Sequence, residues 1–99
     1  MRLITVALLF FYHATSYGNS QCDELSKMAG RIMDSRQSGV PINDMLSVLD
    51  EHGGNASSIL RRWTIEAYKE PLYSTDENKR IAITEFQNEA MILCIEASE

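Results

Sequence analysis

Residues 74–94 read STDENKRIAITEFQNEAMILC, and they decide the fold because they combine a helix start, a long helical repeat and one of two cysteines. Ser74 and Glu77 have the spacing of a capping box, and the acidic pair Asp76 and Glu77 complements the positive end of a helix dipole. Apolar residues then recur at helical spacing as far as Cys94. The stretch therefore predicts a helix that begins near residue 74 and continues to about residue 97.

Apolar side chains occur on two sides of this predicted helix. One stripe, which we expect to face the rest of the protein, contains Ala82, Phe86, Ala90, Leu93 and Cys94. A second stripe, almost opposite, contains Ile81, Ile92 and Ile95. A helix that is apolar on two sides is either central and covered on both, or has one side available to a partner. We expect a central helix, and the partner-facing alternative stays open.

Three shorter helices precede this one in the sequence. Apolar periodicity predicts them at residues 22–37, 43–52 and 57–69, and the chain has no alternating strand pattern. Ser38 and Gly39 end the first helix, Asn43 is expected to cap the second, and the third ends before Pro71. Short turns between amphipathic helices predict an all-α fold, a small bundle of about four helices.

Residues 1–20 have the features of a signal peptide. Arg2 is followed by an apolar run, Leu3 to Tyr12, which is shorter than the roughly 20 residues that a membrane-spanning helix needs. Small residues then permit cleavage after Gly18 or Ser20. We therefore expect a signal peptide over 1–20, a single helical domain over 21–99, export to the bacterial periplasm or beyond, and no stable membrane insertion after cleavage.

The two cysteines, Cys22 and Cys94, both lie in the expected mature chain. Small exported domains bury little apolar surface and usually add a covalent link, and two cysteines allow only one connectivity. The sequence therefore predicts a Cys22–Cys94 disulfide, which would place the first and last helices antiparallel if their lengths overlap.

Charge and residue inventory limit the classes of function. Removing Arg2 with the leader leaves 9 − 1 = 8 Lys and Arg against 14 Asp and Glu, a net charge of 8 − 14 = −6. Such a chain is a poor ligand for nucleic acid or anionic membranes, and a basic protein is the better partner. His52 is the only histidine of the mature chain, and no catalytic motif is present. We expect no enzymatic activity, no cofactor and no metal site.

The second apolar stripe of the last helix is the candidate partner-binding surface. Glu85, Glu89 and Glu96 project along one edge of that helix, beside Ile81, Ile92 and Ile95. An apolar strip bordered by charges of one sign is the usual composition of a recognition surface, and its negative charge would attract a basic partner.

Three segments carry a resemblance to a known family: RQSGVPINDM at 36–45, IEAYKEPLYST at 65–75 and AITEFQNEAMILC at 82–94. Together they resemble a family of small exported helical proteins of unassigned function from tailed phages and bacteria. The resemblance implies a periplasmic address and no particular activity. The matching positions are Arg36, Gln37, Gly39, Pro41, Met45, Ala67, Tyr68, Pro71, Tyr73, Ser74, Thr75, Phe86, Asn88 and the two cysteines.

Two kinds of function agree with these features. The first is a protein-binding or inhibitory protein aimed at a cell-wall hydrolase or superinfection factor; in size, export and linked helices the chain looks like Spackle-type phage proteins, which block a lysozyme domain. The second is a periplasmic chaperone of the acid-stress type, a class that is also small, helical and has two cysteines. Both are analogies of form.

Overall fold

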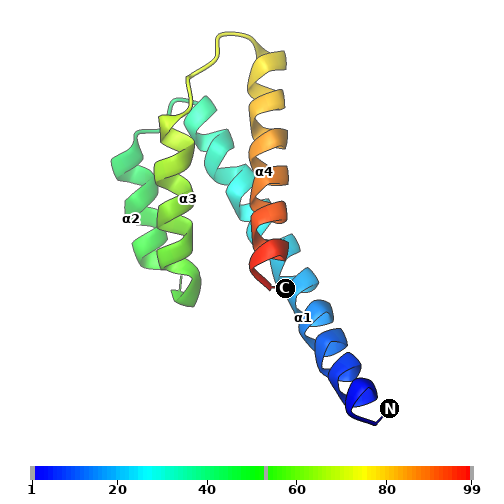
Figure 1. Ribbon diagram of the computed structural model, residues 1–99. Helices are drawn as coiled ribbons and strands as arrows, with labels where there is room; N and C mark the ends of the chain where they lie inside the picture. Colours follow the sequence, from blue (N-terminus) through cyan, green and yellow to red (C-terminus); the bar gives the residue numbers. More distant parts are fainter. Residues whose placement is uncertain (1, 53, 99) are drawn as a thin grey trace.

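The computed structural model describes the backbone of residues 2–52 and 54–98, and the side chains of these ranges from residue 20 onward. Within these ranges the chain forms four α-helices and one 3-10 turn and contains no strand (Figure 1). The prediction of an all-α fold with about four helices is confirmed. The elements are α1 (Arg2–Gln37), α2 (Ile42–His52), η1 (Gly54–Ala56), α3 (Ser57–Lys69) and α4 (Asp76–Ser98).

Helix α1 is the central element. It packs along α4 on one side and against α3 and α2 on the other, and α2 packs on α3 (Figure 1). Ala29, Ile32 and Met33 of α1 are buried in the core that α3 and α4 complete. The expectation that α4 is central is therefore wrong. The apolar pattern of one helix shows which of its sides could be buried. It does not show how many of those sides other helices of the protein cover.

The core also receives residues from every other α-helix. Leu49 comes from α2, and α3 supplies Leu60, Trp63 and Ala67. Helix α4 contributes two fully buried residues among those described, Phe86 and Ala90. The Phe86 ring meets the Trp63 ring edge to face, with centroids 5.6 Å apart. Phe86 is therefore the one large side chain that α4 buries.

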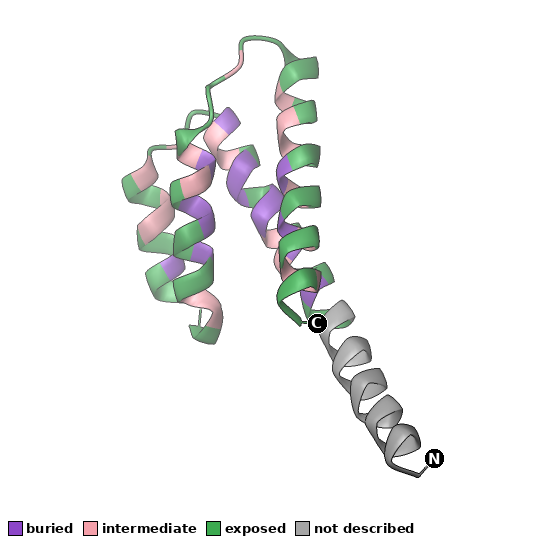
Figure 2. Ribbon diagram, viewed as in Figure 1, coloured by how far each residue is buried: buried purple, intermediate pink, exposed green. Residues whose placement is uncertain are grey.

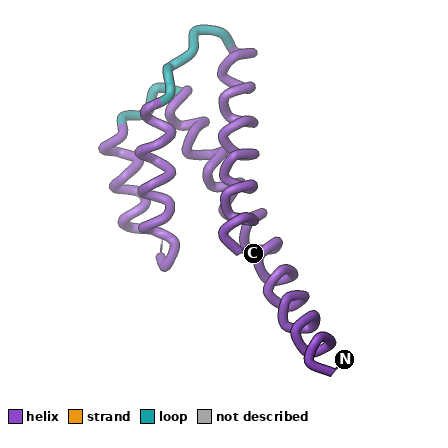
Figure 3. Tube along the Cα trace, in the orientation of Figure 1, coloured by secondary structure: helices purple, strands orange, loops and turns teal. Residues whose placement is uncertain are grey.

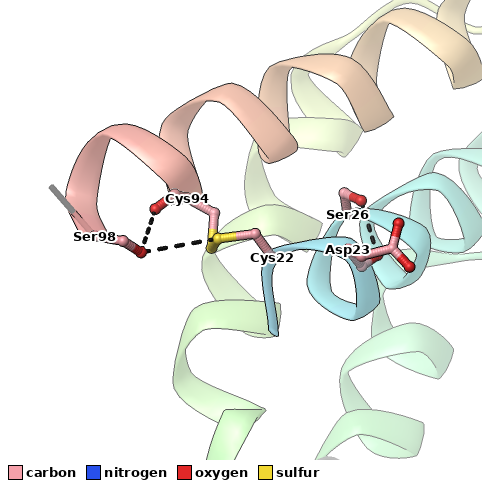
Figure 4. Close-up of a disulfide and its surroundings, with 5 residues drawn as sticks. All are labelled: Cys22, Asp23, Ser26, Cys94 and Ser98. Carbon is pink, nitrogen blue, oxygen red and sulfur yellow. Dashed lines mark hydrogen bonds between the residues drawn. A yellow bond between two sulfur atoms is a disulfide. The ribbon is translucent and has the colours of Figure 1, made fainter. Parts of the chain in front are cut away.

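A disulfide joins the first and last helices of the chain, α1 and α4, as predicted. Cys22 and Cys94 are linked with a Cα–Cα distance of 5.5 Å (Figure 4). The hydroxyl of Ser98 lies 3.9 Å from the Cys22 sulfur and donates a hydrogen bond to the Cys94 carbonyl. At the opposite end, the Lys79 ammonium donates to the Gln37 carbonyl at 2.8 Å. Helix α4 therefore runs antiparallel to α1 and is attached to it near both ends of α4.

Helix α1 ends where the sequence predicts, at a glycine turn. Gly39 has a φ of +85°, a conformation that side chains with a Cβ rarely adopt. Its backbone amide donates to the Arg36 carbonyl, and the Val40 amide donates to the Ser35 carbonyl. These bonds satisfy carbonyls that the helix end leaves without partners, and the chain reverses into α2.

Two predicted helix caps are wrong by one or two residues. Helix α2 begins at Ile42, and the Asp44 and Met45 amides donate to the Pro41 carbonyl, so Asn43 lies inside the helix rather than at its cap. Helix α4 begins at Asp76, and the Thr75 hydroxyl accepts the Asn78 amide at 3.1 Å. Thr75 therefore occupies the cap position that the sequence assigned to Ser74. When two neighbouring residues can both cap a helix, the sequence does not show which of them does so, because that depends on the path by which the chain enters the helix.

The predicted leader boundary at residue 20 lies inside α1, and the leader's side chains, residues 1–19, lie outside the described side chains. None of the helical segments within the described residues has the length and apolar character that crossing a membrane requires.

Candidate functional site

The described residues contain no arrangement that points to metal chemistry. No group of three or more potential ligands among His, Cys, Asp and Glu comes together in this part of the chain. His52 lies at the end of α2 and pairs with its neighbour Glu51 at 3.6 Å, and both side chains are largely exposed. Both cysteines are in the disulfide, so neither is a free thiol.

The outer side of α4 is the largest departure from an ordinary amphipathic helix. Ile81 and Ile92 are 47% and 55% exposed, and Figure 2 shows exposed residues along most of α4. Glu85, Glu89 and Glu96 are also exposed, whereas Ile95 is half-buried. We call these six residues, Ile81, Glu85, Glu89, Ile92, Ile95 and Glu96, the α4 strip. Five of the six are accessible, and Ile95 lies at the margin.

Leu93 corrects one part of the sequence interpretation. It belongs to the stripe expected to face the bundle, together with Phe86 and Ala90, yet it is 46% exposed. Helix α3 packs mainly on α1 and makes little contact with α4. The side of α4 that carries Leu93 therefore has an incomplete cover, because the second layer of helices does not extend over it.

A concave site lies where α4 meets the segment that links it to α3. We call residues 70–75 the connector; Figure 3 shows it as the longer of the loops, arching over the end of the bundle. A cavity of about 200 Å³, which we call the connector groove, opens between the connector and the first half of α4. Its lining residues are Glu70, Tyr73, Asn78, Ile81, Ala82, Glu85, Phe86 and Glu89.

The connector groove brings together half of the α4 strip. Ile81, Glu85 and Glu89 line it, whereas the residues nearer the C-terminus, Ile92, Ile95 and Glu96, do not. A second, shallower hollow on the outer side of α4 is also lined by Ile81 and Glu85. Ile81 and Glu85 therefore border both hollows.

The connector is held in place by the last two residues of α1. The guanidinium of Arg36 donates from Nε and Nη2 to the Glu70 carbonyl, at 3.1 and 3.0 Å. The Gln37 amide is 3% exposed; it donates from Nε2 to the Pro71 carbonyl at 2.8 Å and accepts the Tyr73 amide on Oε1 at 3.0 Å. The connector forms no regular secondary structure, and these hydrogen bonds supply partners for its Glu70 and Pro71 carbonyls and its Tyr73 amide.

Tyr68 completes this end of the molecule. Its hydroxyl donates to the Val40 carbonyl, at 2.6 Å, in the turn between α1 and α2. The Arg36 guanidinium lies over its ring, 5.4 Å from the centroid. Burial raises the pKa of the Tyr68 hydroxyl, which keeps it a donor over the physiological pH range. Five of the positions that carry the family resemblance thus lie together at this end of the molecule, joined by hydrogen bonds and by the Arg36–Tyr68 ring contact: Arg36, Gln37, Tyr68, Pro71 and Tyr73.

Sequence reasoning missed the contribution of the connector to the site. Glu70 and Tyr73 reach the groove only because Gln37 and Arg36 hold the connector against the first turns of α4. A partial signal is present along α4, where 78, 82 and 86 recur at four-residue spacing beside 81, 85 and 89. Two adjacent rows of that kind show which residues share one side of the helix, but they do not reveal the wall opposite.

No family model, no curated protein and no solved structure matches the chain.

Proposed function

We propose that this chain is an exported, non-enzymatic protein that binds a basic partner protein through the α4 strip. The partner class that we propose is a cell-wall hydrolase or superinfection factor, in a phage or bacterial setting. The observation that carries this proposal is the exposure of Ile81 and Ile92 beside Glu85 and Glu89.

The exposed isoleucines matter because they lie on one side of the same helix, beside exposed carboxylates. Isolated exposed aliphatic residues are ordinary, but a row of them along one helix, bordered by one sign of charge, has the composition of an interface. The mature chain's net charge of 8 − 14 = −6 would speed encounter with a basic protein. The disulfide also agrees with an oxidising compartment.

Export has a direct test in the mass of the protein that a bacterium secretes. We expect the chain recovered from the periplasm to begin between Tyr17 and Cys22 and to have a mass two hydrogens below that of the reduced chain. Intact-mass spectrometry with and without reduction measures both. A chain that retains Met1, or a lipid attached to Cys22, would contradict the proposal.

Binding through the α4 strip predicts a large effect of Ile92→Asp. Purified protein is incubated with bacterial periplasmic extract, and the retained basic protein is identified and titrated against the variant. A buried isoleucine anchor replaced by a charge should weaken binding by more than about 2 kcal/mol, or roughly 30-fold, mainly through faster dissociation. The free protein should keep its melting temperature because Ile92 is 55% exposed.

Val48→Asp is the matched control, since Val48 on α2 is 50% exposed and lies off the strip. It should leave binding unchanged. Glu85→Lys with Glu89→Lys should slow association in a salt-dependent way, because rim charges act mainly on encounter. Equal losses for Val48→Asp and Ile92→Asp would refute the α4 strip as the docking surface. Protection of unfolding client proteins at about pH 2 to 3 would instead favour an acid-stress chaperone.

A further inference from the structure

The connector groove differs from the rest of the acidic surface because its lining combines carboxylates with aromatic and aliphatic side chains. Glu70, Glu85 and Glu89 line it, and among the described residues no lysine or arginine does. The ion pairs of the described chain involve other carboxylates, those of Asp23, Asp50, Glu51 and Glu66. Within the described chain none of the three groove carboxylates forms an ion pair, although the Arg36 guanidinium contacts the Glu70 carbonyl and Arg80 lines the neighbouring hollow with Glu85.

Aromatic and aliphatic residues also line the groove. Phe86 lines it while remaining only 6% exposed, and its ring packs edge to face on Trp63 at a centroid distance of 5.6 Å. Tyr73 supplies a second ring, and Ile81 and Ala82 add aliphatic surface. A ligand that enters would therefore meet aromatic and aliphatic groups as well as carboxylates.

The connector wall is fixed before any ligand arrives. The Tyr73 backbone amide donates to the side-chain oxygen of the buried Gln37, and the Glu70 carbonyl accepts hydrogen bonds from Nε and Nη2 of Arg36. These contacts hold the two connector residues that face α4 without using the Glu70 carboxylate. A site whose wall is already ordered loses less entropy on binding than one that must form.

We propose that the connector groove is a receptor for a single arginine side chain of the basic partner, and this inference rests on the proposed function. A guanidinium is planar, stacks on aromatic faces and offers five donors that match carboxylates in pairs. Its aliphatic stem suits Ile81 and Ala82. A lysine ammonium is more strongly hydrated and offers no plane to stack, so it is the weaker occupant. A second copy of this chain is disfavoured by its own negative charge.

The test uses the disulfide-bonded protein purified from the periplasm and three capped tripeptides, Gly-Arg-Gly, Gly-Lys-Gly and Gly-citrulline-Gly. Binding is followed by NMR at the amides and methyl groups of Tyr73, Ile81 and Ala82. The arginine peptide should bind saturably in the millimolar range with shifts confined to the groove. The lysine peptide should bind several-fold more weakly, and the neutral citrulline peptide, of nearly the same shape, should give no saturable shift.

Glu85→Gln with Glu89→Gln should weaken the arginine peptide at least about tenfold, because both carboxylates that α4 supplies are lost. The matched control is Glu24→Gln with Glu51→Gln, two exposed carboxylates away from the groove, and it should leave binding unchanged. Equal shifts for arginine and lysine spread over the whole acidic surface, equal losses in both double variants, or no saturation would each overturn the proposal.

The outcomes separate this inference from the proposed function. If the arginine peptide fails to bind the groove while Ile92→Asp still abolishes partner binding, the arginine receptor is wrong and the α4 strip stands. If the peptide binds as expected but Ile92→Asp leaves partner binding intact, the groove stands and the proposed docking surface fails.

Discussion

Replacing Cys22 with serine should lower the free energy of unfolding by about 4 kcal/mol, which corresponds to a fall in melting temperature of roughly 20 °C for a domain of this size. The two cysteines are 72 residues apart, so the disulfide closes a loop that contains α2, α3 and most of α4. It also fastens the end of α4 to α1, where fraying would otherwise begin. A domain of about 80 residues has a free energy of unfolding of only about 5 to 10 kcal/mol, so this loss is a large part of the total.

The measurement compares thermal and urea unfolding of the oxidised protein with Cys22→Ser, Cys94→Ser and the double variant. All three lose the same link, so the main part of the loss should be common to them. Cys22 is fully buried, so a serine there also adds the cost of an unpaired hydroxyl. Reduction of the unaltered chain separates the two effects. A loss of less than about 1 kcal/mol on reduction would show that packing, rather than the disulfide, holds α1 and α4 together.

Replacing Phe86 with alanine should destabilise the protein by about 3 to 5 kcal/mol even with the disulfide intact. Phe86 is the only large side chain that α4 buries among its described residues, and it contacts Trp63 of α3. Its removal leaves a cavity in the core that α1, α3 and α4 share. Helix α4 would keep its packing along α1 but lose its contact with Trp63 of α3.

Urea unfolding of the oxidised protein measures this loss, with two variants as controls. Phe86→Leu keeps most of the volume and should cost less than about 1.5 kcal/mol. Ile92→Ala, on the exposed side of the same helix, should change the free energy of unfolding by no more than about 0.5 kcal/mol. If Ile92→Ala and Phe86→Ala cost the same, then both sides of α4 are buried in solution and the α4 strip belongs to the core.

Substitutions at Phe86 and at the two glutamates of α4 separate folding from binding at the connector groove. Phe86 both fills the core and lines the groove, so its substitution would change stability and binding together. Glu85 and Glu89 are exposed, so their substitution should change binding with little effect on stability. The carboxylates are therefore the informative positions for the site, and Phe86 is the informative position for the fold.

Much of the architecture could be predicted from residue patterns because its causes are local. The bounds of α3, Ser57–Lys69, agree with the prediction, since Pro71 and the apolar spacing around Trp63 act within a few residues. The end of α1 follows from Gly39, whose positive φ is a property of its own backbone. The disulfide followed from arithmetic, because two cysteines allow one pairing.

Local signals failed where two neighbouring residues could perform the same task. Ser74 and Thr75 are both good helix caps, and the structure uses Thr75 because Gln37 fixes the path of the connector before it enters α4. The hydrogen bonds that decide this join residues more than 30 positions apart. No spacing rule within the connector contains that information.

The sequence by itself determined the helices, their approximate ends apart from the start of α1, the disulfide partner and the negative charge, because each depends on backbone preferences, capping or composition. Helix α1 begins at Arg2 rather than near residue 22. Only the tertiary structure decided that α1 rather than α4 is central, that Leu93 and Ile92 are exposed, and that Glu70 and Tyr73 join α4 in a groove. Apolar burial has no preferred direction, so a stripe on one helix is equally satisfied by a neighbouring helix or by a partner. Which of them covers it depends on where distant segments of the chain come to lie.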